Sequence, residues 1–387
     1  MSRLRSQISV LLTTALGLGS ALWIAAGCGE IDAVERWPSG AALLANTRSL
    51  DRLLEHVAQL EGTPLARRAE RLRASLPDCP TVEGRSESGR ISDIWEALTC
   101  ATGNADLIAL ERARDGWDVA LSFPASGGHG IGTLSIGASG DVELELQLPR
   151  ITGEGLAGLA LPGEAAAGAA ELSESETLIH ARVRPHGGLD LASLVPADSQ
   201  GARLFRLKSE LFAGLVLDGV WEIATYLPEE GKAMPRTALA LNFSNRAAAV
   251  AAMEDFIGNL QESWPVARTF FRLGDADGAC LLDLAIMPGL APCYVATDRA
   301  LIVGWNPASL RKALDGRGGK RDGLGDSSGA IIHLDRFADA DRILSASSRA
   351  EANSQPTQYP WRRITAKAAP DPSGFRLKLR FESGRGT

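Results

Sequence analysis

Apolar and polar residues alternate with a period of two in two clear stretches of the chain. In Val142–Leu148, one valine and three leucines alternate with two glutamates and a glutamine. In Phe375–Phe381, phenylalanines and leucines alternate with Arg376, Lys378 and Arg380. Successive side chains of a strand point to opposite faces, so both stretches predict strands with one buried and one solvated face, as in antiparallel sheets.

A short apolar strand followed by an amphipathic helix recurs along the chain. The four pairs are Ala41–Ala45 with Ser49–Leu60, Thr177–Val183 with Leu189–Val195, Thr237–Phe243 with Arg246–Leu260, and Ala330–Leu334 with Ala338–Leu344. In the first pair, one helical face carries Leu50, Leu53, Leu54, Val57 and Leu60, and Ser49 is the expected N-cap. We therefore expect an α+β fold in which antiparallel sheets are backed by amphipathic helices and built from repeated strand–helix units.

A tight hairpin and a short helix are predicted near residue 300. Tyr294–Thr297 and Ala300–Gly304 are apolar runs on either side of a two-residue turn, which favours a hairpin. Asn306 and Pro307 come next, and proline at the first helical position favours a helix that starts there.

Glycine-rich stretches divide the chain of 387 residues, which is long enough for two domains. Gly153–Ala170, rich in glycine and alanine, is the expected linker, and Gly316–Gly329 is a second candidate. The predicted organisation is a signal peptide at 1–27, a tether at 28–36, an N-terminal α+β domain at 37–152, the linker at 153–170 and a C-terminal α+β domain at 171–387.

The N-terminus is typical of an export signal. Arg3 and Arg5 precede an uncharged stretch that runs to Cys28. The segment Ala25–Cys28 resembles the lipobox of bacterial lipoproteins, although Ala25 stands where leucine is usual. The resemblance implies cleavage before Cys28 and attachment of a lipid to its thiol. An uncleaved signal anchor and a soluble secreted protein are the alternatives.

The same resemblance predicts where the protein is found. Gly29 is not the aspartate that retains such lipoproteins at the inner membrane, so a lipid-anchored place in the cell envelope is expected, at the outer membrane and facing the periplasm or the surface. The formal charge is −7, and loss of Arg3 and Arg5 leaves 38 basic against 47 acidic residues, or −9. This acidic balance excludes nucleic acid as an expected partner, because phosphates need a basic surface.

Four cysteines remain after processing: Cys79, Cys100, Cys280 and Cys293. An even number in an oxidising compartment predicts two disulfides, and closeness in sequence favours Cys79–Cys100 and Cys280–Cys293 among three possible connectivities. The second pair meets a geometric objection. If Cys280–Met287 and Cys293–Thr297 form a simple hairpin, Cys280 lies opposite a residue near Ala300, roughly 20 Å from Cys293. No two cysteines are two to four residues apart, so we expect no zinc site.

The strand–helix units, the leader and the segment Cys293–Leu310 together resemble an uncharacterised family of membrane-anchored bacterial proteins that carry a domain of unknown function. The resemblance covers Trp37–Leu314 loosely. It implies a fold type and no activity, because the family offers no catalytic residues to carry over.

Two motifs match enzyme signatures only in part. Gly153–Gly158 has the G-x-G-x-x-G spacing of dinucleotide sites, but Pro149 separates it from the preceding strand and Pro162 breaks any following helix. Gly325–Gly329 is similar to a serine-protease nucleophile loop, which requires a histidine held by an acid. The histidines are His56, His129, His180, His186 and His333, and no protease-like segment surrounds any of them.

Acidic groups give equally weak signals for metal binding or catalysis. Asp275–Gly278 starts like a calcium loop, but Ile286 occupies the twelfth position, where a glutamate is needed. Glu229 and Glu230 lie in a turn and are expected to be solvated. Asp335, Asp339 and Asp341 suit a helix N-terminus.

These observations predict no catalytic, cofactor-binding or metal-binding residues. The favoured function is a non-enzymatic binding or structural module that contacts an envelope protein, a polymer or a lipid. The alternatives are a carrier of lipid or another hydrophobic ligand, which should contain an apolar cavity, and an enzyme of unrecognised type, which should contain a cleft with converging acids or a histidine.

Overall fold

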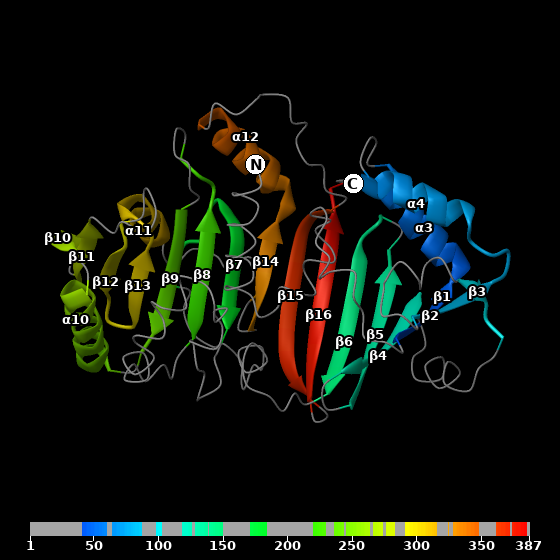
Figure 1. The fold of residues 1–387 in the computed structure, drawn as a ribbon, viewed down its shortest axis with the longest axis horizontal. Coiled ribbons are helices and arrows are strands. Elements are labelled where there is room, and N and C mark those ends of the chain that lie inside the picture. The colour runs from blue at the N-terminus through cyan, green and yellow to red at the C-terminus, as the bar shows by residue number, and fades with distance from the viewer. Residues whose placement is uncertain are drawn as a thin grey trace. The chain divides into compact units, whose positions relative to one another are not determined.

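A computed structural model describes residues 41–59, 64–86, 98–102, 118–125, 128–137, 139–149, 171–183, 220–229, 236–243, 245–263, 266–273, 276–282, 291–315, 324, 328–347, 361–371 and 374–384. These residues form two compact units (Figure 1). We call residues 171–347 the inserted unit, because they lie in the sequence between the two parts of the other. Residues 41–149 and 361–384 form the flanking unit.

An antiparallel sheet forms the centre of the inserted unit. Its strand order is β10-β11-β12-β13-β9-β8-β7-β14. The strands are β7 (Thr177–Val183), β8 (Trp221–Tyr226), β9 (Arg236–Asn242), β10 (Ala267–Leu273), β11 (Ala276–Leu282), β12 (Cys293–Ala296), β13 (Ala300–Gly304) and β14 (Ser328–His333). The hairpin predicted near residue 300 is confirmed as β12–β13.

Two helices cover opposite faces of this sheet. The helix α11 (Pro307–Leu314) packs Leu310 against alternate residues of the sheet such as Ala238, Val295 and Ile302. The helix α10 (Arg246–Ser263) packs Ile257 against the intervening residues. A third helix, α12 (Leu334–Ser347), follows β14. Both faces of the central strands are therefore buried, and β12 reads as a continuous apolar run.

Local chemistry fixes α11 on the sheet. Its N-cap is Asn306, whose side chain accepts a hydrogen bond from the backbone N–H of Ser309 at 2.8 Å, and Pro307 begins the helix as predicted. The Ser309 hydroxyl accepts a hydrogen bond from the backbone N–H of Thr237 in β9 at 3.1 Å. A Cβ atom at Gly304 would lie 2.6 Å from the backbone nitrogen of Leu310, so the close approach of α11 to β13 requires glycine there.

The flanking unit has its own antiparallel sheet, in the order β15-β16-β6-β5-β4-β1-β2-β3. Its strands are β1 (Ala41–Asn46), β2 (Thr81–Ser86), β3 (Thr99–Cys100), β4 (Val119–Ala125), β5 (Gly128–Ile136), β6 (Val142–Pro149), β15 (Trp361–Asp371) and β16 (Gly374–Ser383). The alternation predicted for β16 is confirmed, because Leu377 and Leu379 are buried while Arg376, Lys378 and Arg380 are exposed.

The helices α3 (Thr47–Ala58) and α4 (Pro64–Ala74) pack against the end of the flanking sheet that contains β1 and β2. Leu50, Leu54 and Val57 face the core, as the helical pattern predicts. The N-cap is Asn46 and not Ser49, and the Asn46 side chain accepts a hydrogen bond from the backbone N–H of Ser49 at 3.1 Å. The Ser49 hydroxyl instead bonds the carboxylate of Asp118.

Both expected disulfides are present, Cys79–Cys100 and Cys280–Cys293. The geometric objection to the second rested on a wrong register. β11 ends at Leu282, and its pairing with β12 places Cys280 directly opposite Cys293.

The predicted α+β class is wrong, because the fold is β-rich. The described residues form sixteen strands and five helices, and most strands follow one another without an intervening helix among these residues. A helix directly follows a strand at β1–α3, β9–α10, β13–α11 and β14–α12, whereas the helix predicted at Leu189–Val195 lies outside the described residues. Strands buried on both faces lack the period-two pattern of apolar and polar residues, so the sequence pattern shows fewer strands than the fold contains, whereas amphipathic helices remain recognisable.

The two compact units do not match the predicted C-terminal domain. The sequence predicts a single domain over 171–387, whereas β16 pairs with β6 from Gly374 to Phe381 and so belongs to the flanking sheet. The signal peptide, Cys28, the tether and the linker 153–170 lie outside the described residues. Within the described part of the chain, no helix combines the length and the apolar character needed to cross a bilayer.

Candidate functional site

Charged side chains are buried on the α11 face of the inserted unit. His180 and Arg182 of β7 and Glu222 of β8 are each at most 2% exposed. The Nε2 atom of His180 lies 2.7 Å from a Glu222 carboxylate oxygen, and its Nδ1 atom lies 3.8 Å from Glu174. Strand register places Arg182 directly opposite Glu222. Buried charges of this kind are costly unless they compensate one another.

This buried cluster holds a segment of the backbone in place. The second oxygen of Glu222 accepts hydrogen bonds from the backbone N–H groups of Glu171 and Leu172, at 2.7 and 3.3 Å. Two residues further on, the backbone N–H of Ser173 donates to the carbonyl of Ala313 in α11 at 2.9 Å. A histidine and acids therefore do converge, but they are enclosed, and their contacts serve the attachment of residues 171–173.

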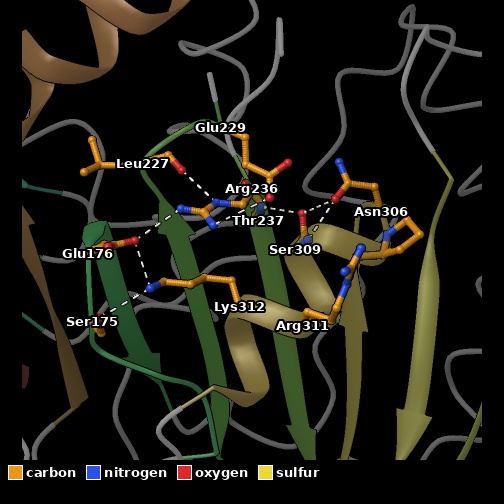
Figure 2. Close-up of polar contacts among 11 residues, drawn as sticks. Ser175, Glu176, Leu227, Glu229, Arg236, Thr237, Asn306, Ser309, Arg311 and Lys312 are labelled. Atoms are coloured by element: carbon orange, nitrogen blue, oxygen red, sulfur yellow. Dashed lines mark hydrogen bonds and ion pairs between the residues drawn. The ribbon is translucent and has the colours of Figure 1, made fainter. Parts of the chain in front are cut away.

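The end of this segment forms an ion-pair network with β9 and α11 (Figure 2). The Glu176 carboxylate lies 2.8 Å from Lys312 Nζ and 3.3 Å from the Arg236 guanidinium. Arg236 also donates through Nε to the carbonyl of Leu227 at 2.8 Å and lies 3.9 Å from Glu229. The hydrogen bond from Lys312 holds the pKa of Glu176 below its ordinary value, with help from the charge of Arg236.

Glu176 occupies an unusual backbone conformation. Its φ is +59°, the left-handed region that residues with a Cβ atom rarely adopt. Strained backbone of this kind persists only where the surroundings enforce it. Here the two cations from different elements fix the carboxylate between them.

An open depression of about 630 Å³ lies beside this network on the α11 face. Its charged lining residues include Arg236, Arg311 and Lys312, with Glu229 and Asp315 as the acids. Arg311 differs from the other two cations. Its Nε atom donates to the Pro307 carbonyl at 3.4 Å, and among the described residues its two terminal amino groups have no hydrogen-bond partner.

A second distinctive surface is the edge strand β10, which pairs with β11. Phe270 is 70% exposed and Leu273 is 39% exposed, and these are the exposed large apolar side chains of the described residues. The guanidinium of Arg268 lies 4.5 Å from the centre of the Phe270 ring and pairs with Glu254 of α10. A cation over an aromatic face is attracted to it, so Arg268 holds the exposed ring in position.

Two side chains beside Arg268, Glu254 and Tyr294, have shifted pKa values. The hydrogen bond from Arg268 lowers the pKa of Glu254. Burial, with the hydrogen bond to Glu254 as the next cause, raises the pKa of Tyr294 to about 12.

The motif residues singled out from the sequence do not come together. Glu229 pairs with Arg236, Asp277 pairs with Arg272, and the His56 ring lies 6.4 Å from that of Trp361. His333 ends β14, and Asp335 and Asp339 lie in α12. The following candidates lie outside the described residues: Cys28, Gly153–Gly158, His186, Glu230, Asp275, Ile286 and Gly325.

Sequence reasoning missed Arg182, Glu222, Arg236, Arg311 and Phe270. The available signal was charge at positions where a buried strand should be apolar, as in Trp221-Glu222-Ile223. Within the described residues, no three His, Cys, Asp or Glu side chains are grouped so that they could hold a metal ion.

No known protein family matches the chain, and no curated protein and no solved structure is detectably similar to it. The assignment of function therefore depends on the surfaces described above.

Proposed function

We propose that the protein is an exported envelope lipoprotein, anchored through Cys28, that acts as a non-enzymatic binding module. Its binding surface in this proposal is the edge strand β10, to which an extended segment of a partner protein adds as a further strand. The lipobox-like segment supports the anchor, and the two disulfides agree with an oxidising compartment.

The exposure of Phe270 at the middle of an edge strand is the observation that carries this proposal. An edge strand presents unpaired backbone groups that an extended peptide can bind, and side chains along the strand then give specificity. The Phe270 ring, which is held exposed by Arg268, offers such a side-chain contact.

The charges of β10 favour a different protein over a second copy of this chain. Arg268 and Arg272 flank Phe270 on the same face of the strand, and β10 contains no acidic residue. Antiparallel pairing of two copies along all seven residues would place Arg268 opposite Arg272 twice, and like charges directly opposite each other are destabilising. A partner strand with an apolar residue opposite Phe270 and an acid opposite Arg272 would avoid this.

A photo-crosslinking amino acid at position 270 tests the proposal in cells that make the protein. We expect one discrete adduct with another envelope protein, and we expect Arg272→Glu to reduce it several-fold. A crosslinker at Asp298, whose side chain is also exposed, is the matched control and should give no such adduct. No adduct at 270 above the level at 298, or an adduct with the mass of two copies, would refute the proposal.

A further inference from the structure

We propose that the depression beside α11 is a binding site for an amphipathic anion, meaning a carboxylate or phosphate group carried on an apolar chain, and that Arg311 contacts the anionic group. This site lies on the opposite face of β10 from Phe270, and among its described lining residues only Leu273 belongs to β10, so each proposal can fail without the other.

The three cations in the depression differ in the contacts that they make with the protein. Arg236 and Lys312 are held by acceptors of the protein itself, including the shared carboxylate of Glu176. Arg311 is exposed and has two terminal amino groups without partners among the described residues. A guanidinium binds carboxylate or phosphate through two parallel hydrogen bonds, so Arg311 offers the geometry that such a group needs.

The other lining residues favour a ligand whose anionic group carries an apolar chain. Ala276, Val295, Ala308 and Leu314 line the depression, together with the partly exposed Leu273. Its volume of about 630 Å³ lies within the range of roughly 300–1,000 Å³ that is usual for small-molecule sites. A small inorganic anion would leave Leu273, Ala308 and Leu314 in contact with water, whereas an acyl or aromatic chain would cover them.

The protein's own contacts fix the elements around the depression. The Asn306–Ser309–Thr237 hydrogen bonds attach α11 to β9, and the Glu176 ion pairs attach α11 to the end of residues 171–176 (Figure 2). Binding to a site that is already organised loses less conformational entropy. The carboxylate of Asp315, four residues after Arg311 and also in the lining, is the group that would compete with the ligand.

Isothermal titration calorimetry of the purified protein with decanoate tests this inference. Decyl phosphate, decanol and acetate are the comparison ligands, and they separate the contributions of head group, charge and chain. We expect decanoate or decyl phosphate to bind, and the tighter of the two identifies the preferred head group. Decanol and acetate should each bind at least about tenfold more weakly, and higher salt should weaken binding of the anions.

Three variants make the test specific to the site. Arg311→Ala should weaken binding at least about tenfold, because it removes the charged hydrogen-bond donor to the anionic group. Asp315→Asn should have the opposite effect and strengthen binding. Arg342→Ala removes an exposed arginine from α12 and should change nothing. The inference is overturned if decanol binds as tightly as decanoate, if Arg311→Ala binds normally while circular dichroism shows it folded, or if none of the ligands binds.

Discussion

Burying a charge in the core of the flanking sheet should unfold that unit, whereas removing the charges of the neighbouring positions should not. Leu377 of β16 is 3% exposed, and its neighbours Arg376 and Lys378 point to the solvated face. We therefore compare Leu377→Asp with the triple variant in which Arg376, Lys378 and Arg380 are all replaced by alanine.

The expected cost of Leu377→Asp has two parts. Loss of a buried leucine side chain costs about 3–5 kcal/mol. An aspartate that enters the core must do so in its neutral form, and protonating a group of pKa near 3.9 at pH 7 costs about 4 kcal/mol. The sum is comparable with the total stability of a domain, so most molecules should lose the folded flanking unit at pH 7. Leu377→Asn avoids the protonation cost, and the difference between the two variants should shrink as the pH falls from 7 to 4.

The triple variant should lose far less. Arg376 lies 3.4 Å from Glu145 and 3.0 Å from Asp371, Lys378 pairs with Glu143, and Arg380 lies 3.8 Å from Glu382. The three basic side chains are about half exposed, and exposed ion pairs contribute about 0–1 kcal/mol each, so we expect a total of about 1–2 kcal/mol.

Guanidinium denaturation followed by circular dichroism measures both effects, with Leu377→Ala as an intermediate standard. If the triple variant unfolds as readily as Leu377→Asp, or if Leu377→Asp is no worse than Leu377→Asn at pH 7, the assignment of buried and solvated faces is wrong.

Four further predictions address other parts of the chain. Cys28→Ala should leave an unprocessed precursor or release the protein from membranes, and fractionation with unchanged processing and membrane partition would contradict lipidation. Replacing both Cys79 and Cys100 by serine should lower the free energy of unfolding by about 3 kcal/mol, because the disulfide closes a loop with a 21-residue separation and so restricts the unfolded chain. A double-serine variant that melts like the parent would contradict this. Gly304→Ala should cost about 1–3 kcal/mol because its Cβ atom would meet the backbone of Leu310, and Gly258→Ala, where nothing lies within 4 Å, is the control that should be tolerated. Burial raises the pKa of Tyr294 to about 12 in the folded state, against about 10 when unfolded, so the phenol binds its proton more tightly in the folded protein. Tyr294 therefore contributes stability below pH 10 that is lost as the pH rises to 12. In Tyr294→Phe the loss of stability between pH 10 and 12 should be smaller, as denaturation measured at each pH would show.

The sequence predicted those elements whose burial is one-sided. β16 faces water on one side only, so its alternation could be read directly, and the apolar stripe of α3 likewise predicted its core face. β12 is buried on both faces and shows no alternation, so the hairpin there was inferred from its turn. The α+β assignment failed because such strands are hard to count from sequence, whereas amphipathic helices are conspicuous.

The candidate sites depend on contacts between residues far apart in the chain. Glu176, Arg236 and Lys312 come from three elements, and no local pattern links them. His180 and Arg182 look like the solvated positions of a strand, since charged side chains are usually exposed. Only the pairing of β7 with β8 shows that both are buried near Glu222.

The pairing of β16 with β6 has a consequence for how the protein matures. Synthesis proceeds from the N-terminus, so β6 is made long before β16, and the whole inserted unit is made in between. Pairing between strands so distant in sequence is slow, and the edge of β6, which stays unpaired until β16 is made, is prone to aggregation. Glu143 and Glu145 on β6 would repel other acidic segments during this interval, as gatekeeper charges do. Their ion pairs with Lys378 and Arg376 then favour the pairing of β16 with this edge.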